Sequence, residues 1–284
     1  MNHADFFALL ETLTPTRLAE PWDNVGLLLD PEPARSQVAR VLVAIDLTEP
    51  VLAEALAFDA DVVVAYHPAI FSGLKRITRE TPMGRRLLRL AQAGVALWSP
   101  HTALDAIPGG MNDWLATGLG DAATSAALKP CAAAPELAGA GLQGAGLGRL
   151  ITLTQPVTLA AAVARLKTHL GLSHVRVAAA PAHVDRPDAP ALPIDRIALC
   201  PGAGGSLFAP LPGPTAGGPA LYVTGEWGHH DVLAKVAQGA SVILTEHSNT
   251  ERGFLPIYAT WLRQGTTNVD VRVSRRDADP LVVW

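Results

Sequence analysis

Apolar and polar residues alternate along the first 120 positions in a pattern typical of strands and helices that follow each other in turn. Short apolar runs rich in β-branched residues predict three strands, at 38–47, 61–68 and 95–99. Stretches with helical periodicity predict helices at 48–60, 82–94 and 109–120, the first with Thr48 as its N-cap and Pro50 in its first turn. This β-α-β-α-β order indicates a parallel sheet with helices packed on it.

The second half of the chain resumes this alternation after an alanine-rich, irregular stretch at 121–145. Residues 148–171 predict a strand and a helix, 195–208 a strand that runs into a glycine-rich turn, and 231–255 a helix, a strand and a second helix. The order "VLVAIDL", helix, "DVVVAYHP" is echoed by "RIALCPG", helix, "SVILTEHS". We therefore expect an α/β fold of two similar lobes facing each other, at about 1–125 and 126–260, with the C-terminal segment returning to lobe one.

Composition and charge argue against several classes of protein. Of the 284 residues, 49% are hydrophobic and 17% are charged, which is typical of a compact globular chain. The formal charge of −4 gives no basic surplus for a nucleic-acid surface, and the apolar runs fall short of the roughly 20 residues of a membrane helix. Two cysteines form no disulfide framework, and the N-terminal residues lack the design of a signal peptide. We therefore expect a cytoplasmic protein.

Histidine and carboxylate side chains gather just beyond the predicted strands. The residues in question are His67, His101, Asp105, His247 and Glu251. Because the carboxyl ends of strands in an open α/β sheet border the ligand site, these side chains could share a metal. Mixed imidazole and carboxylate ligands favour zinc, manganese, iron or cobalt over calcium. For any single pair, an ordinary hydrogen bond at a strand or helix end is the simpler explanation.

Two details of this pattern concern the histidines of the second half. If the chain turns helical after His247, Ser248 or Asn249 caps the helix and Glu251 shares a face with His247. The pair His229 and His230 stands next to a predicted helix start, where one could line a pocket while the other is solvated.

Two loops also allow a functional and a structural interpretation. "GAGGS" at 202–206 could cradle a phosphate through its backbone N–H groups, but it lacks the Lys-Ser/Thr ending of a P-loop and is more often a tight turn. "PWDNVGLLLD" at 21–30 puts Trp22, Asp23 and Asn24 in a loop before an apolar strand. A cap and a core tryptophan are the simplest explanation there.

Four stretches occur together and in order: "PWDNVGLLLD", "YHPAIFSGLKRIT", "SPHTALDAIPGGMNDWLA" and "TEHSNTERGFL". They resemble the signatures of the Nif-three-like dinuclear-metal proteins, or NGG-interacting factor family, and run from residue 21 to 255. The resemblance implies a site for two divalent transition metal ions in the cleft between two α/β lobes, and a ring-shaped homo-hexamer. By position, the ligands it implies are His67, His101, Asp105, His247 and Glu251, with Glu251 as the bridging carboxylate.

One position departs from many bacterial relatives, which have two adjacent histidines where this chain has Tyr66-His67. The tyrosine form also occurs in the family, notably in its eukaryotic branch. The departure implies fewer protein ligands or weaker binding at one of the two ions.

The expected chemistry is hydrolysis of a small-molecule substrate, because two bridged metals lower the pKa of a shared water. Glu251 would act at the metals, and His229 or His230 would move a proton. Many family members carry the label GTP cyclohydrolase I type 2, which points to a nucleotide, but ring-opening of GTP, phosphoester hydrolysis and amide hydrolysis all stay open. The alternative is a non-enzymatic metal-binding scaffold, or a metal-delivery or regulatory interaction protein.

Overall fold

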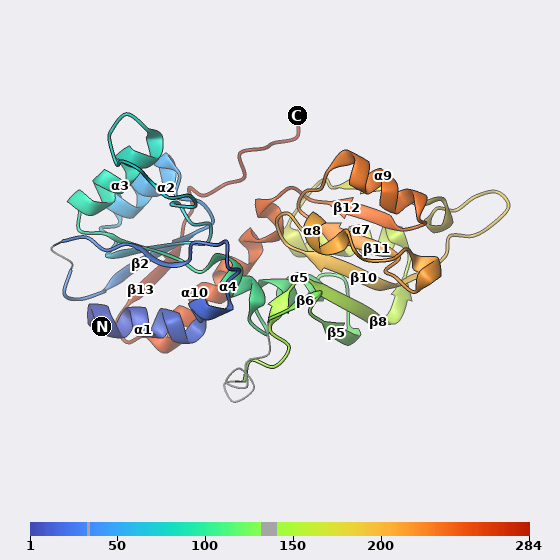
Figure 1. Cartoon of the computed structure of the whole chain (residues 1–284), viewed down its shortest axis with the longest axis horizontal. Coiled ribbons are helices and arrows are strands. Elements are labelled where there is room, and N and C mark those ends of the chain that lie inside the picture. The colour runs from blue at the N-terminus through green and yellow to red at the C-terminus, as the bar shows by residue number, and fades with distance from the viewer. Residues whose placement is uncertain (33–34, 132–140) are drawn as a thin grey trace. The chain divides into compact units, whose positions relative to one another are not determined.

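The computed structural model describes residues 1–32, 35–131 and 141–284, which belong to two compact units (Figure 1). The first unit consists of Met1–Leu104 and Phe254–Pro280, and the second of Asp105–Gly253 with the last residues Leu281–Trp284. The sequence places the lobe boundaries near 125 and 260 instead. The chain first passes from the first unit to the second between Leu104 and Asp105, inside the helix α4 (His101–Ala106).

A five-stranded sheet of order β1-β4-β3-β2-β13 forms the first unit. Its strands are β1 (Gly26–Leu29), β4 (Ala96–Ser99), β3 (Val62–Ala65), β2 (Arg40–Ala44) and β13 (Asp270–Val273). Strands β4, β3, β2 and β13 are parallel, and β1 pairs antiparallel with β4. The predicted parallel sheet is confirmed, and its last strand comes from the C-terminal segment of the chain.

Helices cover both faces of this sheet, with α2 (Glu49–Ala57) and α3 (Pro82–Gln92) on one face and α1 (His3–Leu13) and α10 (Leu255–Gly265) on the other (Figure 1). Helix α2 begins as the sequence predicts, because the Thr48 hydroxyl accepts a hydrogen bond from the Val51 N–H and a proline occupies the first turn. Leu52 and Leu87 from the two helices pack on buried residues of β2, β3 and β4.

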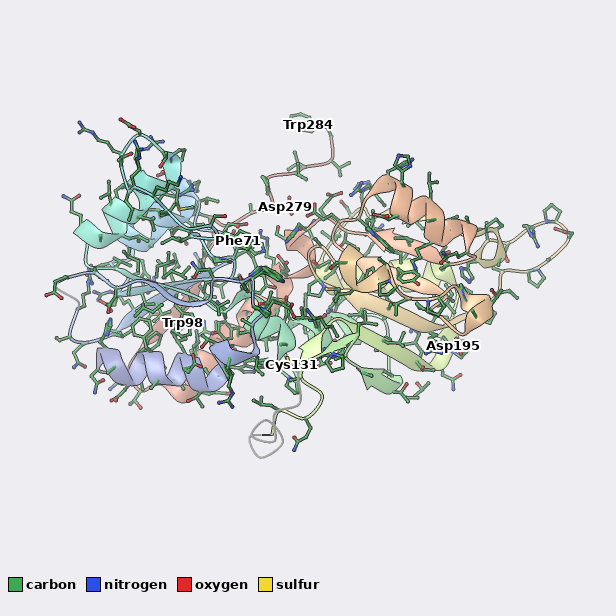
Figure 2. All side chains as sticks on the ribbon, in the orientation of Figure 1. Phe71, Trp98, Cys131, Asp195, Asp279 and Trp284 are labelled. Atoms are coloured by element: carbon green, nitrogen blue, oxygen red, sulfur yellow. The ribbon has the colours of Figure 1, made fainter. Side chains whose placement is uncertain are left out.

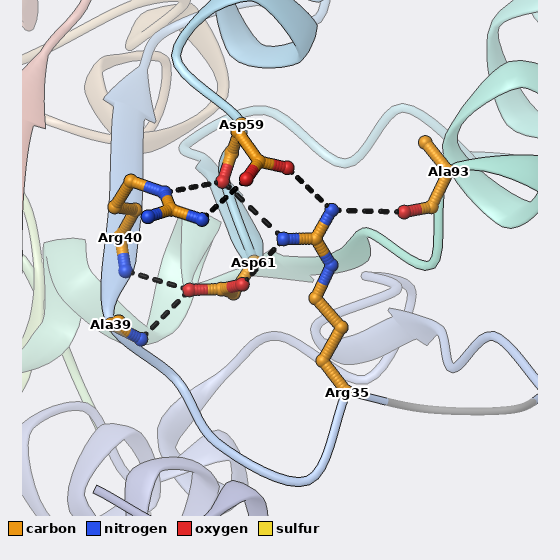
Figure 3. A network of polar contacts seen from close by, with 6 residues as sticks. All are labelled: Arg35, Ala39, Arg40, Asp59, Asp61 and Ala93. Carbon is orange, nitrogen blue, oxygen red and sulfur yellow. Dashed lines mark hydrogen bonds and ion pairs between the residues drawn. The ribbon is translucent and has the colours of Figure 1, made fainter.

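A network of charged side chains links the starts of β2 and β3 (Figure 3). The buried Asp61 carboxylate accepts hydrogen bonds from the N–H groups of Ala39 and Arg40, each at 2.7 Å, and from Arg35 Nη1 at 2.7 Å. Arg35 also pairs with the exposed Asp59 at 2.8 Å. Asp61 directly precedes β3 and Arg40 opens β2, so these bonds fix the alignment of the two strands.

The second unit contains a six-stranded sheet of order β5-β8-β10-β11-β12-β9. Its strands are β5 (Ala122–Ala126), β8 (Arg149–Val157), β10 (Ile194–Cys200), β11 (Leu221–Thr224), β12 (Ser241–Leu244) and β9 (Arg176–Ala178). The three strands β10, β11 and β12 are parallel, and the outer strands run antiparallel to their neighbours. The short strands β6 (Lys129–Pro130) and β7 (Gly146–Leu147) pair separately.

Alternate residues of the central strands face two separate cores in this unit. Ile197 and Leu199 of β10 pack with residues of α5 (Met111–Thr117) and α7 (Leu159–Leu170). Tyr222 of β11 faces the other side, where it packs with Phe208 of the short helix α8 (Gly205–Phe208) and Val232 of α9 (His229–Ala237). Across the described parts of the chain, no helix combines the length and apolar character that crossing a membrane requires.

Several predicted elements differ from the structure. The stretch at 121–145, predicted to be irregular, contains β5 and β6, and its residues 132–140 lie outside the described part of the chain. After His247 the chain forms two 3₁₀ turns, Ser248–Thr250 and Arg252–Phe254, and only then the helix α10, so the prediction of a helix capped by Ser248 or Asn249 is wrong. Further 3₁₀ turns lie at Thr16–Leu18, Pro181–His183 and Pro214–Ala216.

The two units repeat one order of elements, which the sequence only partly reveals. In the first unit the order is β2-α2-β3-α3-β4, and in the second it is β10-α8-β11-α9-β12. Strand β11, whose four residues stand between glycine- and proline-rich segments, is not predicted from the sequence. The echo seen in the sequence therefore pairs β12 with β3. The structure matches β12 with β4, which makes His247 and Glu251 the counterparts of His101 and Asp105.

Candidate metal centre

His67 lies just beyond the carboxyl end of β3 in the first unit. The pairing of β2 with β3 continues past the strand, because the N–H groups of Tyr66 and His67 donate to the carbonyls of Ala44 and Ile45 at 2.8 and 2.9 Å. These bonds hold His67 beside Asp46, and 3.0 Å separates His67 Nδ1 from Asp46 Oδ1. The imidazole is thereby oriented through one nitrogen, and the other nitrogen remains a candidate ligand atom.

His101 begins α4, one residue after the break at Pro100, with an unusual φ of 26°. Its Nδ1 lies 2.8 Å from Asp23 Oδ1, and the Asp23 carboxylate also accepts hydrogen bonds from the N–H and the hydroxyl of Thr102. Burial by itself raises the pKa of Asp23, but the hydrogen bonds from His101 and Thr102 outweigh it and hold that pKa below its usual value. Asp23 is therefore a carboxylate that both caps α4 and orients His101.

The first unit brings His67 and His101 together. Their ring centroids are 5.5 Å apart, and the Tyr66 ring lies 5.0 Å from that of His67 and 5.5 Å from that of His101. Tyr66 is almost completely buried, so its ring packs against both imidazoles.

His247 lies beyond the carboxyl end of β12 in the second unit, after Glu246, which has a left-handed φ of 67°. Its Nδ1 is 2.7 Å from Glu226 Oε1, and Glu226 follows the neighbouring strand β11. Its Nε2 is 3.4 Å from Oε1 of Glu251, which is only 2% exposed. If Nδ1 carries the proton toward Glu226, Nε2 and the carboxylate oxygen are both electron-pair donors, and this close approach suits a cation that binds both.

Asp105 lies in the second unit, one helical turn after His101 on α4. Within this unit Asp105 and Glu251 both act on the thiol of Cys200. Burial raises the pKa of that thiol, and the negative charges of Asp105 and Glu251 raise it further, against an opposing effect of Arg149. Two buried carboxylates and the positive charge of Arg149 thus act on one thiol, as expected where burial makes like charges costly unless an opposite charge offsets them.

Gly202 leaves room for the side chains of Glu251 and His247 in the second unit. Its φ is 62°, and a Cβ at this position would lie 2.8 Å from Glu251 Oε1 and 2.9 Å from His247 Nε2. Its N–H donates to the Thr250 hydroxyl at 2.8 Å, and its carbonyl accepts from the Glu226 N–H at 3.0 Å. Gly202 therefore links, through its backbone hydrogen bonds, the segment that carries His247 and Glu251 to the one that carries Glu226.

The remaining candidates behave differently. His229 and His230 are exposed at the start of α9, with ring centroids 5.4 Å apart. In the glycine-rich loop, the Gly202 and Gly204 N–H groups donate to the hydroxyls of Thr250 and Thr224. These two amides serve the fold, which favours the tight-turn interpretation over a phosphate cradle. The interpretation of Trp22 as a core residue is wrong, because 58% of it is exposed.

Three histidines share one chemical arrangement, in which Nδ1 faces a carboxylate. The carboxylate partners cannot be recognised from the sequence, since Asp23, Asp46 and Glu226 lie 78, 21 and 21 positions away from their histidines. For Asp46 and Glu226 the available signal is an acidic residue just after the strand that neighbours the histidine's own. A carboxylate on the second nitrogen is the usual support of a metal-ligating imidazole, so these donors fit a metal site. His67 in the first unit, and His247 and Glu251 in the second, each offer an atom that could hold a metal ion.

Comparison with known proteins places this α/β chain in a family. The model of Duf34/NIF3 (NGG1p interacting factor 3) matches residues 1–280. The protein NIF3 homolog of Schizosaccharomyces pombe is 41% identical over 96% of this chain and 95% of its own length, and the NGG1-interacting factor 3 of Saccharomyces cerevisiae is 37% identical over 100% and 98%. A Bacillus cereus protein related to NIF3 has the same fold, with a TM-score of 0.81 at 20% identity over 100% of this chain and 99% of that one. The chain belongs to the DUF34/NIF3 family, as its motifs predict.

Proposed function

We propose that this chain is a dinuclear metal-binding hydrolase that acts on a small molecule, a nucleotide or another phosphate-containing compound. The observation that carries the proposal is the set of three imidazoles whose Nδ1 atoms each face a carboxylate. In this proposal His67, His101, Asp105, His247 and Glu251 would hold two ions of zinc, manganese, iron or cobalt, and the Glu251 carboxylate would serve both.

The chain's own residues prepare this chemistry. Bound divalent ions would supply Lewis acidity, which lowers the pKa of water and stabilises negative charge on a substrate. With the proton on Nδ1, each histidine would donate it to Asp46, Asp23 or Glu226, and Nε2 would retain its lone pair for a metal. His229, which is exposed at the start of α9, exchanges protons between the site and solvent in this proposal.

Metal content and turnover, measured together, test the proposal. Glu251→Gln keeps the shape of the side chain but removes its charge, so we expect loss of bound metal and of any hydrolysis in a screen of nucleotides and phosphoesters. Glu246→Gln is the matched control, because Glu246 lies in the same segment but pairs with Arg176 at 2.9 Å. Protein purified without chelator or affinity tag that neither contains nor takes up zinc or manganese would refute the proposal.

A non-enzymatic role is the alternative, supported by the name of a relative. The Saccharomyces cerevisiae protein is called an interacting factor. In that case the same residues would bind metal in a scaffold, a metal-delivery protein or a regulator. Two tightly bound ions without turnover of any compound in the screen, and with full retention of the fold in Glu251→Gln, would favour this alternative.

We further propose that the protein is a cytoplasmic homo-hexamer, as the family resemblance implies. The low share of charged residues, 17%, supports assembly because few charges are available to cover the surface of a monomer. Light scattering coupled to gel filtration measures the mass directly, and we expect six copies of the 29.7 kDa chain. A monomer at micromolar concentration would contradict the hexamer and leave the metal proposal intact.

A further inference from the structure

Two aromatic side chains are exposed beside His101 in the first unit. Trp22 is 58% and Phe71 53% exposed, although residues of this size and polarity usually bury most of their surface. Their ring centroids are 6.0 Å apart at an interplanar angle of 58°, and both rings approach the His101 ring, at 6.1 and 6.4 Å. Figure 2 labels Phe71 among the side chains of this unit.

The loops that carry these rings are fixed to each other and to α4. Asn24 Nδ2 donates to the Ile70 carbonyl at 2.5 Å, which joins the loop of Trp22 to that of Phe71. Asp23, which stands between Trp22 and Asn24, is bonded to His101 and Thr102. These hydrogen bonds hold the backbone that carries the two rings. A ligand that stacks on the rings therefore needs little further ordering of the protein, which keeps the entropic cost of binding low.

The segment that follows Phe71 is irregular, exposed and basic. It carries Lys75, Arg76 and Arg79, all exposed, along with the exposed apolar residues Leu74 and Ile77. Long surface segments without secondary structure are commonly binding loops. Aromatic side chains next to basic side chains suit a ligand with a flat ring and a negative group. The ligand ring stacks on the aromatic side chains, and the basic side chains attract the negative group.

We propose that Trp22 and Phe71 form a stacking subsite for a planar heteroaromatic ring, and that Lys75 and Arg76 bind an anionic group on the same ligand. The ligand class is a nucleotide or a chemically similar compound. The role of this ligand as a substrate rests on the proposed function, whereas its binding does not. His101, which both aromatic rings contact, links the subsite to the candidate metal ligands.

Calorimetric titration of the full-length protein with GMP, AMP and ribose 5-phosphate tests the subsite. Stacking of a base is worth about 1–3 kcal/mol, so Trp22→Ala and Phe71→Ala should each weaken GMP and AMP about 5- to 150-fold. Both should leave ribose 5-phosphate unchanged, because it has no aromatic ring. Trp22→Phe should retain most of the affinity. Trp284→Ala is the matched control, since Trp284 is also exposed but lies at the C-terminus.

The anion contact has its own variant, Lys75→Ala combined with Arg76→Ala, which should weaken the nucleotides and ribose 5-phosphate by the same factor. The proposal is overturned if the wild type binds no nucleotide at millimolar concentration, or binds ribose 5-phosphate as tightly as GMP. It is also overturned if the aromatic variants change the mass of the particle and not the nucleotide affinity, since the rings would then be a contact between copies. Metal content measured in the same samples separates these outcomes from failure of the metal proposal.

Discussion

Replacing Gly202 with alanine tests the geometry of the second unit most directly. The new methyl group would lie 2.8 Å from Glu251 Oε1 and 2.9 Å from His247 Nε2, whereas ordinary contacts begin at 3.4 Å. The two donor atoms would therefore have to retreat by 3.4 − 2.8 = 0.6 Å and 3.4 − 2.9 = 0.5 Å, unless the loop itself moves.

Two separable costs follow from this change. The left-handed backbone, with φ of 62°, costs alanine about 1–2 kcal/mol of folding free energy. The displaced donors should weaken metal binding about 10- to 100-fold, the usual effect of disturbing groups that orient metal ligands. That factor corresponds to about 1.4–2.7 kcal/mol of binding free energy.

Gly171→Ala is a control that carries only the first cost. Gly171 ends α7 with φ of 67°, and a Cβ added there would meet nothing within 4 Å. Urea unfolding in the presence of chelator should show similar losses for both variants, while competition titration with zinc should show weaker binding for Gly202→Ala alone. If Gly202→Ala binds zinc like the wild type, the arrangement of Glu251 and His247 around this glycine is wrong.

Three further predictions concern other parts of the molecule. Asp61→Ala removes the buried carboxylate of a partly buried ion pair and should lower the free energy of unfolding by about 3 kcal/mol in urea titrations. The loss should be smaller for the exposed Asp59→Ala, and equal losses would contradict the role of burial. If the proposed two ions are bound, Tyr66→Phe should keep them by elemental analysis, because the buried Tyr66 ring packs against both imidazoles, whereas Tyr66→His should bind one ion more tightly. Loss of an ion in Tyr66→Phe would make Tyr66 a ligand. The Nδ1 of the buried His183 lies 2.8 Å from the Ser241 hydroxyl. Burial lowers the pKa of His183 below its unfolded value of 6.5, so this histidine takes up a proton at higher pH in the unfolded chain than in the folded one. The His183 contribution to stability should therefore be complete above pH 6.5 and decline as the pH falls through 6.5 toward the folded pKa, and His183→Gln should flatten the decline of urea midpoints below pH 6.5; an unchanged slope would contradict this.

The sequence predicts the first unit better than the second. Three consecutive valines before His67 and the Thr48-Pro50 pair mark a strand and a helix start through local preferences, and both are confirmed. Strand β11 escapes prediction because four residues between irregular segments carry little periodicity. The turns after His247 are 3₁₀ and not α, a choice that depends on tertiary bonds such as that from Gly202 to Thr250.

The candidate site shows the same limit. Histidines and acids just beyond strand ends can be found by spacing, and so were His67, His101 and His247. Their carboxylate partners come from other loops, and only the folded chain pairs them. The exposure of Trp22 is equally non-local, since a large apolar side chain in a loop is expected to be buried unless the surface has a use for it.

The place of β13 has a consequence for how the chain folds as it is synthesised. This strand pairs with β2, with Asp270 opposite Arg40, so the first sheet lacks its edge strand until nearly the whole chain has left the ribosome. All six strands of the second unit's sheet lie between Asp105 and Gly253, so that sheet can be completed earlier. During that interval β2 exposes an unpaired edge, which is a site for aggregation or for a chaperone. A chain truncated before β13 would keep that edge open permanently.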